Sequence, residues 1–258
     1  MKKIIRFVLN KIPRSVIQRF ASWLVPLIGI FYCGRKVECP VCGHHYRKFL
    51  PYGYSVSRGN ALCPHCLSLE RHRLMYLYLK RETDFFTARP RLLHIAPEVC
   101  LMRHFEKLFK GDFAANYVTA DLESPLAKVK MDIRNIPFGE NEFDVIFCNH
   151  LLEHVWEDVA AMKEMYRVMR KGGWGIMMHP VNPDRAATWE DPTIDTPEKR
   201  YAAFGQYDHV REYGKDFADR LRSAGFTVEE NDYVTHLSSD EISKYALRSE
   251  IIYLVKKS

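Results

Sequence analysis

The clearest pattern of apolar and polar positions lies between Asn116 and Pro180, where short apolar runs alternate with a helical pattern. The sequence predicts strands over residues 116–120, 129–131, 143–148 and 174–179, and a helix over residues 159–170. Lys171-Gly172-Gly173 separates that helix from the last of these strands. Short apolar runs bounded by chain-breaking residues and alternating with helices indicate an α/β fold with a parallel sheet.

Polar residues follow the predicted strands at the points where these strands end. Asp121 follows the first, Asp132 the second, and Asn149 with His150 the third. Open α/β sheets bind ligands outside the carboxyl ends of their strands. We therefore expect these side chains to border a ligand site.

In their order and spacing, these segments resemble the class I S-adenosylmethionine (SAM)-dependent methyltransferases over residues 91–257. The resemblance implies a Rossmann-like sheet with helices on both faces. It also implies a final helix and an antiparallel pair of strands, which we expect at residues 215–224, 226–229 and 251–255. We accordingly expect a SAM-dependent methyltransferase.

The resemblance also assigns cofactor contacts. Asp121 matches the acidic residue that binds the ribose hydroxyls of SAM in this family, and Leu122 follows it. Asp132 and Ile133 match the pair that lies by the adenine. Asn149 and His150 belong to the segment that resembles the family's motif after the fourth strand.

In the family a glycine-rich loop follows the first strand of the sheet, and residues 92–100, the corresponding segment here, depart from that pattern. Ala96 takes the place of the first glycine of a glycine-rich loop, and Glu98 and Cys100 replace the later ones. Glycines at such positions let the backbone approach a ligand closely. Glu98 either supplies a carboxylate to the amino-acid end of SAM or lies in the first turn of the next helix, where an acid suits the helix dipole. We expect His94, Ala96 and Glu98 to contact the cofactor.

Two Cys-x-x-Cys pairs stand apart from the sheet pattern. Cys39 and Cys42 form the first pair, Cys63 and Cys66 the second, and twenty residues separate the pairs. This spacing is typical of a four-cysteine zinc ribbon, and four thiolates leave no open position for catalysis. Two disulfides or a redox pair are the alternatives, but no export signal is evident and the cytosol keeps thiols reduced. The other cysteines are expected to be buried thiols: Cys33, Cys100 and Cys148.

Charge divides the chain in two. The net charge is +6 overall, which combines +12 over residues 1–90 with −6 over the remainder. At helical spacing, the first twelve residues combine an apolar stripe with basic residues that lie off it. The stripe consists of Ile4, Ile5, Val8, Leu9 and Ile12, and the basic residues are Lys2, Lys3, Arg6 and Lys11. Residues 1–33 either pack on the protein or a second subunit, or contact the inner face of a membrane as a peripheral helix. The apolar run of residues 20–33 is too short to span a bilayer.

These features divide the chain into N-terminal helices (residues 1–34), a zinc ribbon with a linker helix (35–83) and a methyltransferase domain (84–258). Within the last segment, the irregular residues 182–213 follow a strand end and are expected to cover the cleft. The candidate residues for proton transfer are His150, His179, Asp208 and His209. Methyl transfer needs a general base only when the acceptor must lose its proton early.

The acceptor is not specified by the sequence. We expect a cytoplasmic enzyme acting on a glycan, a lipid-linked intermediate or another small polar molecule. An RNA methyltransferase is one alternative, because the basic front of the chain suits an anionic partner. The other alternative is a degenerate methyltransferase fold that serves as a binding or scaffold module, because the loop glycines are missing.

Overall fold

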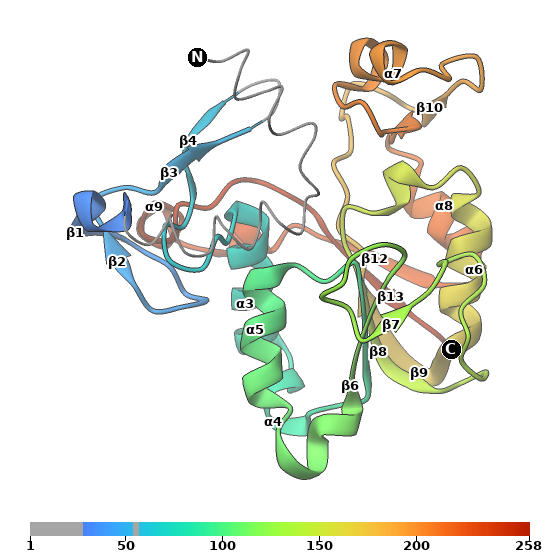
Figure 1. Ribbon diagram of the computed structural model, residues 1–258, viewed down its shortest axis with the longest axis horizontal. Coiled ribbons are helices and arrows are strands. Elements are labelled where there is room, and N and C mark those ends of the chain that lie inside the picture. Colours follow the sequence, from blue (N-terminus) through green and yellow to red (C-terminus); the bar gives the residue numbers. More distant parts are fainter. Residues whose placement is uncertain (1–27, 54–56) are drawn as a thin grey trace.

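A seven-stranded sheet forms the centre of the molecule (Figure 1). The computed structural model describes residues 28–53 and 57–258. In spatial order the strands are β12 (Thr227–Asn231), β13 (Ile252–Lys256), β9 (Met169–Ile176), β8 (Phe143–Cys148), β5 (Leu92–Ile95), β6 (Tyr117–Asp121) and β7 (Val129–Lys130). Strands β9, β8, β5, β6 and β7 are parallel, and β13 runs antiparallel to β9 and β12. The predicted fold class is confirmed.

Helices cover both faces of the sheet because the central strands are apolar on both sides. Leu92 of β5 belongs to one core cluster and its neighbour Leu93 to the other, as strand geometry requires. The first cluster includes residues of α3 (Glu70–Glu82), α4 (Phe85–Ala88) and α5 (Val99–Leu108). The second includes residues of α6 (Asp158–Val168) and α8 (Phe217–Ser223). The short 3-10 helices η2 (Gly111–Asn116) and η3 (Leu152–His154) precede β6 and α6.

The boundary between α6 and β9 lies earlier in the chain than the sequence predicted. Helix α6 ends at Val168, and β9 already begins at Met169, so the segment expected to end the helix belongs to the strand. Gly173 and Gly175 allow β9 to approach β8 closely. A Cβ atom on Gly175 would lie 2.4 Å from the carbonyl oxygen of Ile146, and one on Gly173 2.9 Å from that of Asp144. These glycines are needed for strand packing.

The ribbon consists of two small antiparallel hairpins. Strand β1 (Cys33–Glu38), which follows η1 (Ile30–Tyr32), pairs with β2 (His45–Tyr46), and β3 (Leu50–Tyr52) pairs with β4 (Arg58–Leu62). Helix α3 then connects the ribbon to the sheet, and apolar residues from its N-cap onward are buried: Leu69, Leu74, Leu77 and Tyr78. The first core cluster is continuous from the ribbon to the sheet.

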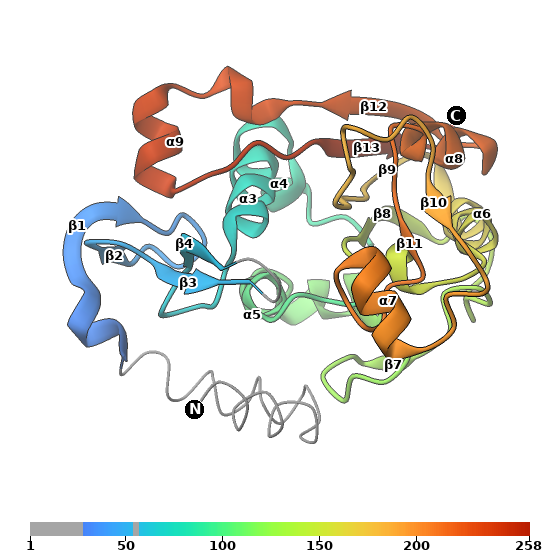
Figure 2. The same ribbon diagram turned by 90° about the horizontal axis from the view of Figure 1, so that it is seen from above.

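The segment between the last two strands extends across the molecule to the ribbon (Figure 2). It contains η4 (Tyr233–His236) and α9 (Ser239–Tyr245). Lys244 of α9 lies 2.9 Å from the Glu38 carboxylate. The guanidinium of Arg73, fully buried, donates 2.7 Å hydrogen bonds to the carbonyl oxygens of Tyr245 and Ala246. Arg73 also donates to two ribbon carbonyls, so it joins three segments.

The irregular segment after β9 forms a separate layer at the carboxyl end of the sheet. It contains β10 (Trp189–Glu190), α7 (Pro197–Phe204) and β11 (Arg211–Glu212), and β10 pairs with β11 antiparallel. The amide of Val210 donates a 2.9 Å hydrogen bond to the carbonyl oxygen of Glu153 in η3. This segment therefore lies against the loop that follows β8.

Two expectations about the N-terminal part need comment. Cys33 is exposed, contrary to prediction, because β1 leaves its first four residues in solvent; Cys100 and Cys148 are buried as expected. The amphipathic stripe of the first twelve residues lies outside the described part of the chain, so membrane contact stays a prediction. Among residues 28–53 and 57–258, no helix has both the length and the hydropathy needed to cross a bilayer.

Candidate functional site

The loop after β5 keeps a glycine-like backbone without glycine. Ala96 has φ of +48°, in the left-handed region, and its amide donates a 2.8 Å hydrogen bond to the carbonyl oxygen of Ala120. A left-handed conformation costs a non-glycine residue about 1–2 kcal/mol. The surrounding strands therefore hold Ala96 in the geometry that the family's first glycine would adopt freely.

Glu98 links the ends of β5 and β8. Its Oε2 accepts a 2.8 Å hydrogen bond from Nε2 of His94, and its Oε1 accepts one of 3.1 Å from Nδ2 of Asn149. Asn149 in turn accepts a 2.9 Å hydrogen bond from the amide of Met178. Burial disfavours the charged form of Glu98, but the hydrogen bond and charge of His94 outweigh it and lower the pKa of Glu98 to about 2. Glu98 is thus an ionised carboxylate at the carboxyl edge of the sheet.

A substitution of Asn149 tests this connection. Asn149→Ala leaves Oε1 of Glu98 and the Met178 amide without partners in a buried region. We expect the free energy of unfolding to fall by on the order of 1–3 kcal/mol, the range for unpaired buried polar groups. Urea denaturation measures the change, with Asn135→Ala, an exposed residue, as the control. Equal stability of both variants would show that the Asn149 hydrogen bonds contribute nothing.

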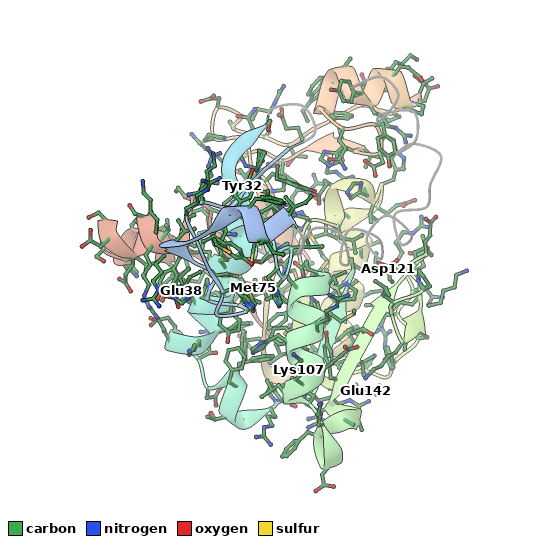
Figure 3. All side chains as sticks on the ribbon, turned by 60° about the vertical axis from the view of Figure 1, so that its left-hand side comes forward. Tyr32, Glu38, Met75, Lys107, Asp121 and Glu142 are labelled. Carbon is green, nitrogen blue, oxygen red and sulfur yellow. The ribbon has the colours of Figure 1, made fainter. Side chains whose placement is uncertain are left out.

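Asp121 lies at the end of β6, toward the opposite end of the strands from Glu142 (Figure 3). Its Oδ1 accepts 2.8 Å hydrogen bonds from the amides of Glu123 and Ser124. Its Oδ2 has no hydrogen bond within the described part of the chain. The adjacent Leu122 is 53% exposed, which places an apolar side chain beside a carboxylate oxygen that has no partner.

Asp132 follows β7 but is already paired. The guanidinium of Arg134 donates to both oxygens of its carboxylate, at distances from 2.7 to 3.1 Å. These hydrogen bonds lower the pKa of Asp132. Ile133, the next residue, is buried. Any contact of Asp132 with a cofactor must share the carboxylate with Arg134.

Glu153, which sequence analysis did not single out, is the centre of a buried histidine cluster. Nδ1 of His179 donates a 2.7 Å hydrogen bond to its Oε2, and Nδ1 of His150 lies 3.6 Å from its Oε1. Nε2 of His150 lies 3.3 Å from Oε1 of Glu250. Two predicted catalytic residues, His150 and His179, are therefore brought together by Glu153.

The protonation states of this cluster follow from its contacts. Burial and the nearby Arg71 charge oppose protonation of His150, but its hydrogen bonds to Glu153 and Glu250 raise its pKa. Burial opposes ionisation of Glu153, yet the two histidines hold its pKa well below the usual range. Burial lowers the pKa of His179. His179 is thus a neutral imidazole, and its Nε2 has no partner among the described groups.

Asp208 and His209, the other predicted catalytic residues, lie beside His154 of η3. Nδ1 of His154 donates a 3.1 Å hydrogen bond to the carbonyl oxygen of Asp208, and the rings of His154 and His209 are 4.8 Å apart. Burial lowers the pKa of His209. A cavity of about 340 Å³ opens here, lined by Glu153, Pro180, Val181, Asn182, Phe204, His209, Arg211, Glu212 and Tyr213. Of the four candidates for proton transfer, only His209 lines this cavity.

The four predicted metal ligands meet in the ribbon. Sγ of Cys39 lies 3.6 Å from that of Cys66, and Sγ of Cys42 lies 3.7 Å from that of Cys63. All four sulfur atoms lie within 4.8 Å of one another. A tetrahedron with Zn–S bonds of about 2.3 Å has edges of about 3.8 Å, so the sulfur spacing fits a zinc ion.

Turn geometry brings the sulfur atoms together. The amides of Gly43 and Leu67 donate hydrogen bonds of 2.8 and 3.0 Å to the carbonyl oxygens of Cys39 and Cys63, respectively. Gly43 and Leu67 both adopt left-handed φ, +74° and +64°. The two pairs of cysteines therefore form equivalent turns, although only the first contains the glycine that such a turn favours.

Comparison with known proteins identifies part of the chain. Residues 98–177 match the family model described as "Methyltransferase domain". This part of the chain is similar to methyltransferase domains, and the match spans about a third of the 258 residues. It contains Glu98, Asp121, Asp132, Asn149 and residues 150–154, and the match supports the predicted enzyme class, a methyltransferase.

Curated relatives match the same region over short stretches. A demethylmenaquinone methyltransferase of Staphylococcus epidermidis is 33% identical over 78 residues, which are 28% of this chain and 32% of that protein. The uncharacterized protein YafE of Escherichia coli is 28% identical over 121 residues, which are 44% of this chain and 58% of that protein. The chain thus spans about a third of the length of the first relative and under two thirds of the second.

Among solved structures, the YcgJ protein from Bacillus subtilis aligns with a TM-score of 0.46 and 14% identity, covering 73% of this chain and 99% of its own. The [4+2]-cyclase SpnF aligns with a TM-score of 0.46 and 14% identity, and the alignment covers 93% of this chain and 95% of the SpnF chain. The fold of this chain is defined by its own strand order.

Proposed function

We propose that this chain transfers a methyl group from SAM to a small polar acceptor that enters the cavity beside Glu153. The methyltransferase-domain match carries the proposal, because its residues include each side chain that borders the carboxyl ends of β6, β7 and β8. Bound SAM supplies an electrophilic methyl group on a sulfonium. The protein's task is then to align the two reactants and exclude water.

The residues present fit a SAM molecule at the carboxyl edge. The free oxygen of Asp121 would accept hydrogen bonds from the ribose hydroxyls, and the exposed Leu122 side chain would cover an apolar part of the cofactor. Nε of Arg71 is buried with no partner among the described groups, which suits a carboxylate ligand. Glu98, already ionised, suits the ammonium group. Asp132 and Ile133 would lie by the adenine.

The cavity favours a small neutral or cationic acceptor. Its lining combines the Glu153 and Glu212 carboxylates with the aromatic rings of Phe204 and Tyr213. The single cationic lining residue, Arg211, is fully buried and bonded to Glu190. Carboxylates repel phosphates, so this lining supports a glycan or another small polar molecule over RNA, whose binding depends on neutralising phosphates. The acceptor in the name of the Staphylococcus relative belongs to a protein of which this chain spans about a third.

We further propose a structural zinc ion on Cys39, Cys42, Cys63 and Cys66. The sulfur spacing and the paired turns support this assignment, and the quartet would use all four positions of a tetrahedral ion. Its role is to hold the two hairpins of the ribbon together. Helix α3 connects the ribbon to the sheet, so the ion would also limit movement of the ribbon relative to the sheet.

Calorimetric titration with SAM and with S-adenosylhomocysteine tests the proposed function. We expect saturable binding of one molecule per chain, followed by transfer of a radiolabelled methyl group to members of a panel of glycans and small polar compounds. Absence of binding by well-folded protein would contradict the proposal and would favour a scaffold module. Transfer to RNA alone would contradict the assignment of a small acceptor.

A further inference from the structure

We propose that Glu153, His154 and His209 bind a divalent transition-metal ion of the Zn²⁺ or Co²⁺ type, at a site separate from the four cysteines. One donor atom from each of the three residues lies within 4.8 Å of the other two. Glu153 and His154 come from η3, and His209 comes from the segment before β11. The backbone hydrogen bond from Val210 to Glu153 holds the two segments together.

The donor set determines the class of ion. Two imidazoles and one carboxylate are ligands for zinc, cobalt, nickel and iron, whereas magnesium and calcium prefer sites made of oxygen atoms. The same combination of two histidines and one glutamate occurs in catalytic zinc sites, where the fourth position remains open. A calcium or magnesium site at this position is therefore disfavoured.

Neighbouring groups orient two of the three ligands, His154 and Glu153. His154 donates from Nδ1 to the carbonyl oxygen of Asp208, so its proton is on Nδ1 and the lone pair on Nε2 is available. His179 donates to Glu153 and fixes that carboxylate from the side of the protein interior. His209 makes no hydrogen bond through its ring within the part of the chain that the structure describes. Such outer hydrogen bonds are the usual support of metal-binding histidines and carboxylates.

Small side-chain movements suffice to close the site. Zinc bonds to nitrogen and oxygen of about 2.0–2.2 Å correspond to donor–donor distances of about 3.4 Å, so donor atoms that lie within 4.8 Å of one another must approach by at most about 1.4 Å. His209 is only partly buried, and its ring can turn toward the fixed pair.

The site faces the cavity, which gives the ion a function. Glu153 and His209 both line the cavity of about 340 Å³, so the open coordination positions are accessible to a small molecule. An acceptor oxygen or nitrogen can occupy one of them and be held in place by the ion. This role rests on the proposed methyl transfer, whereas binding of the ion does not.

Equilibrium dialysis of the full chain against Zn²⁺, followed by elemental analysis, tests the site. We expect two ions per chain in the unaltered protein and one in His209→Ala. The control His236→Ala removes an exposed histidine, 66% accessible at its side chain, and is expected to keep two. A single ion in the unaltered protein, or two in His209→Ala, would overturn the proposal.

Cobalt substitution distinguishes the two sites within one sample. Co²⁺ bound by thiolates shows sulfur-to-metal charge-transfer absorption, and Co²⁺ bound by nitrogen and oxygen does not. We expect His209→Ala to lose the ligand-field absorption of the second ion while retaining the thiolate bands. If His209→Ala lost only the thiolate bands, His209 would not be a ligand of the second ion, and the assignment would be overturned.

A SAM titration of the same samples separates this proposal from the proposed function. SAM binding without a second ion contradicts only the metal site. A second ion without SAM binding contradicts only the methyltransferase assignment. A thermal melt of His209→Ala close to that of the unaltered protein shows that lost metal reflects a lost ligand and not unfolding, and Glu153→Gln provides an independent second variant.

Discussion

Replacing Cys63 with serine is expected to release the ribbon zinc and to unfold the N-terminal part of the described chain. Cys63 is fully buried, and its Sγ lies 3.7 Å from that of Cys42. Structural zinc contributes roughly 10–16 kcal/mol of binding free energy that is coupled to folding. Loss of one thiolate should therefore lower the free energy of unfolding by on the order of several kcal/mol. Elemental analysis and thermal denaturation measure the two effects.

The effect should extend to the sheet. The ribbon, helix α3 and one face of the sheet share a continuous core, and Arg73 joins the ribbon to the segment after α9. The matched control is Cys33→Ser, because Cys33 is exposed and outside the quartet. A Cys63→Ser protein that retains its metal and the melting temperature of the control would contradict the assignment of this quartet.

Replacing Asp121 is expected to weaken SAM binding by on the order of 1–3 kcal/mol, or roughly 5- to 150-fold in Kd. The physical reason is the loss of a carboxylate oxygen that has no other partner among the described residues. Calorimetry with Asp121→Ala measures the loss. Because Oδ1 of Asp121 also accepts from the amides of Glu123 and Ser124, this variant should lose some stability too.

Asp121→Asn separates the two contributions. The amide oxygen of asparagine can still accept from the turn, so stability should be kept while the charge is lost. We expect both variants to bind SAM more weakly and only Asp121→Ala to melt earlier. Asp112→Ala, an exposed residue of η2, is the control. Unchanged SAM affinity in both Asp121 variants would show that the ribose is held elsewhere.

The sequence predicted the elements whose signals are local. Short apolar runs that end at Asp121 and Asn149 predicted strands of the sheet, because a strand buried on both faces must be apolar on both sides. The spacing of Cys39, Cys42, Cys63 and Cys66 predicted their convergence, because two intervening residues allow both thiolates of a pair to face one point. The boundary at Val168 was predicted two residues too late, since Lys171-Gly172-Gly173 was interpreted as the break before the strand. These residues in fact belong to β9, where Gly173 allows close approach to β8.

Only the tertiary structure decided which polar groups meet. Glu250 reaches His150 from a hundred positions away, and Arg73 bonds to carbonyl oxygens of residues 245 and 246. Glu153 belongs to the segment that resembles the family's motif after the fourth strand, but no role was predicted for it. Chain packing places it between His150, His179 and the cavity. The backbone conformation and the burial of a residue depend largely on the pattern of residues next to it in the sequence, so they can be predicted from that pattern. The partners of a buried charge are chosen by long-range packing, which brings together residues that share no sequence pattern.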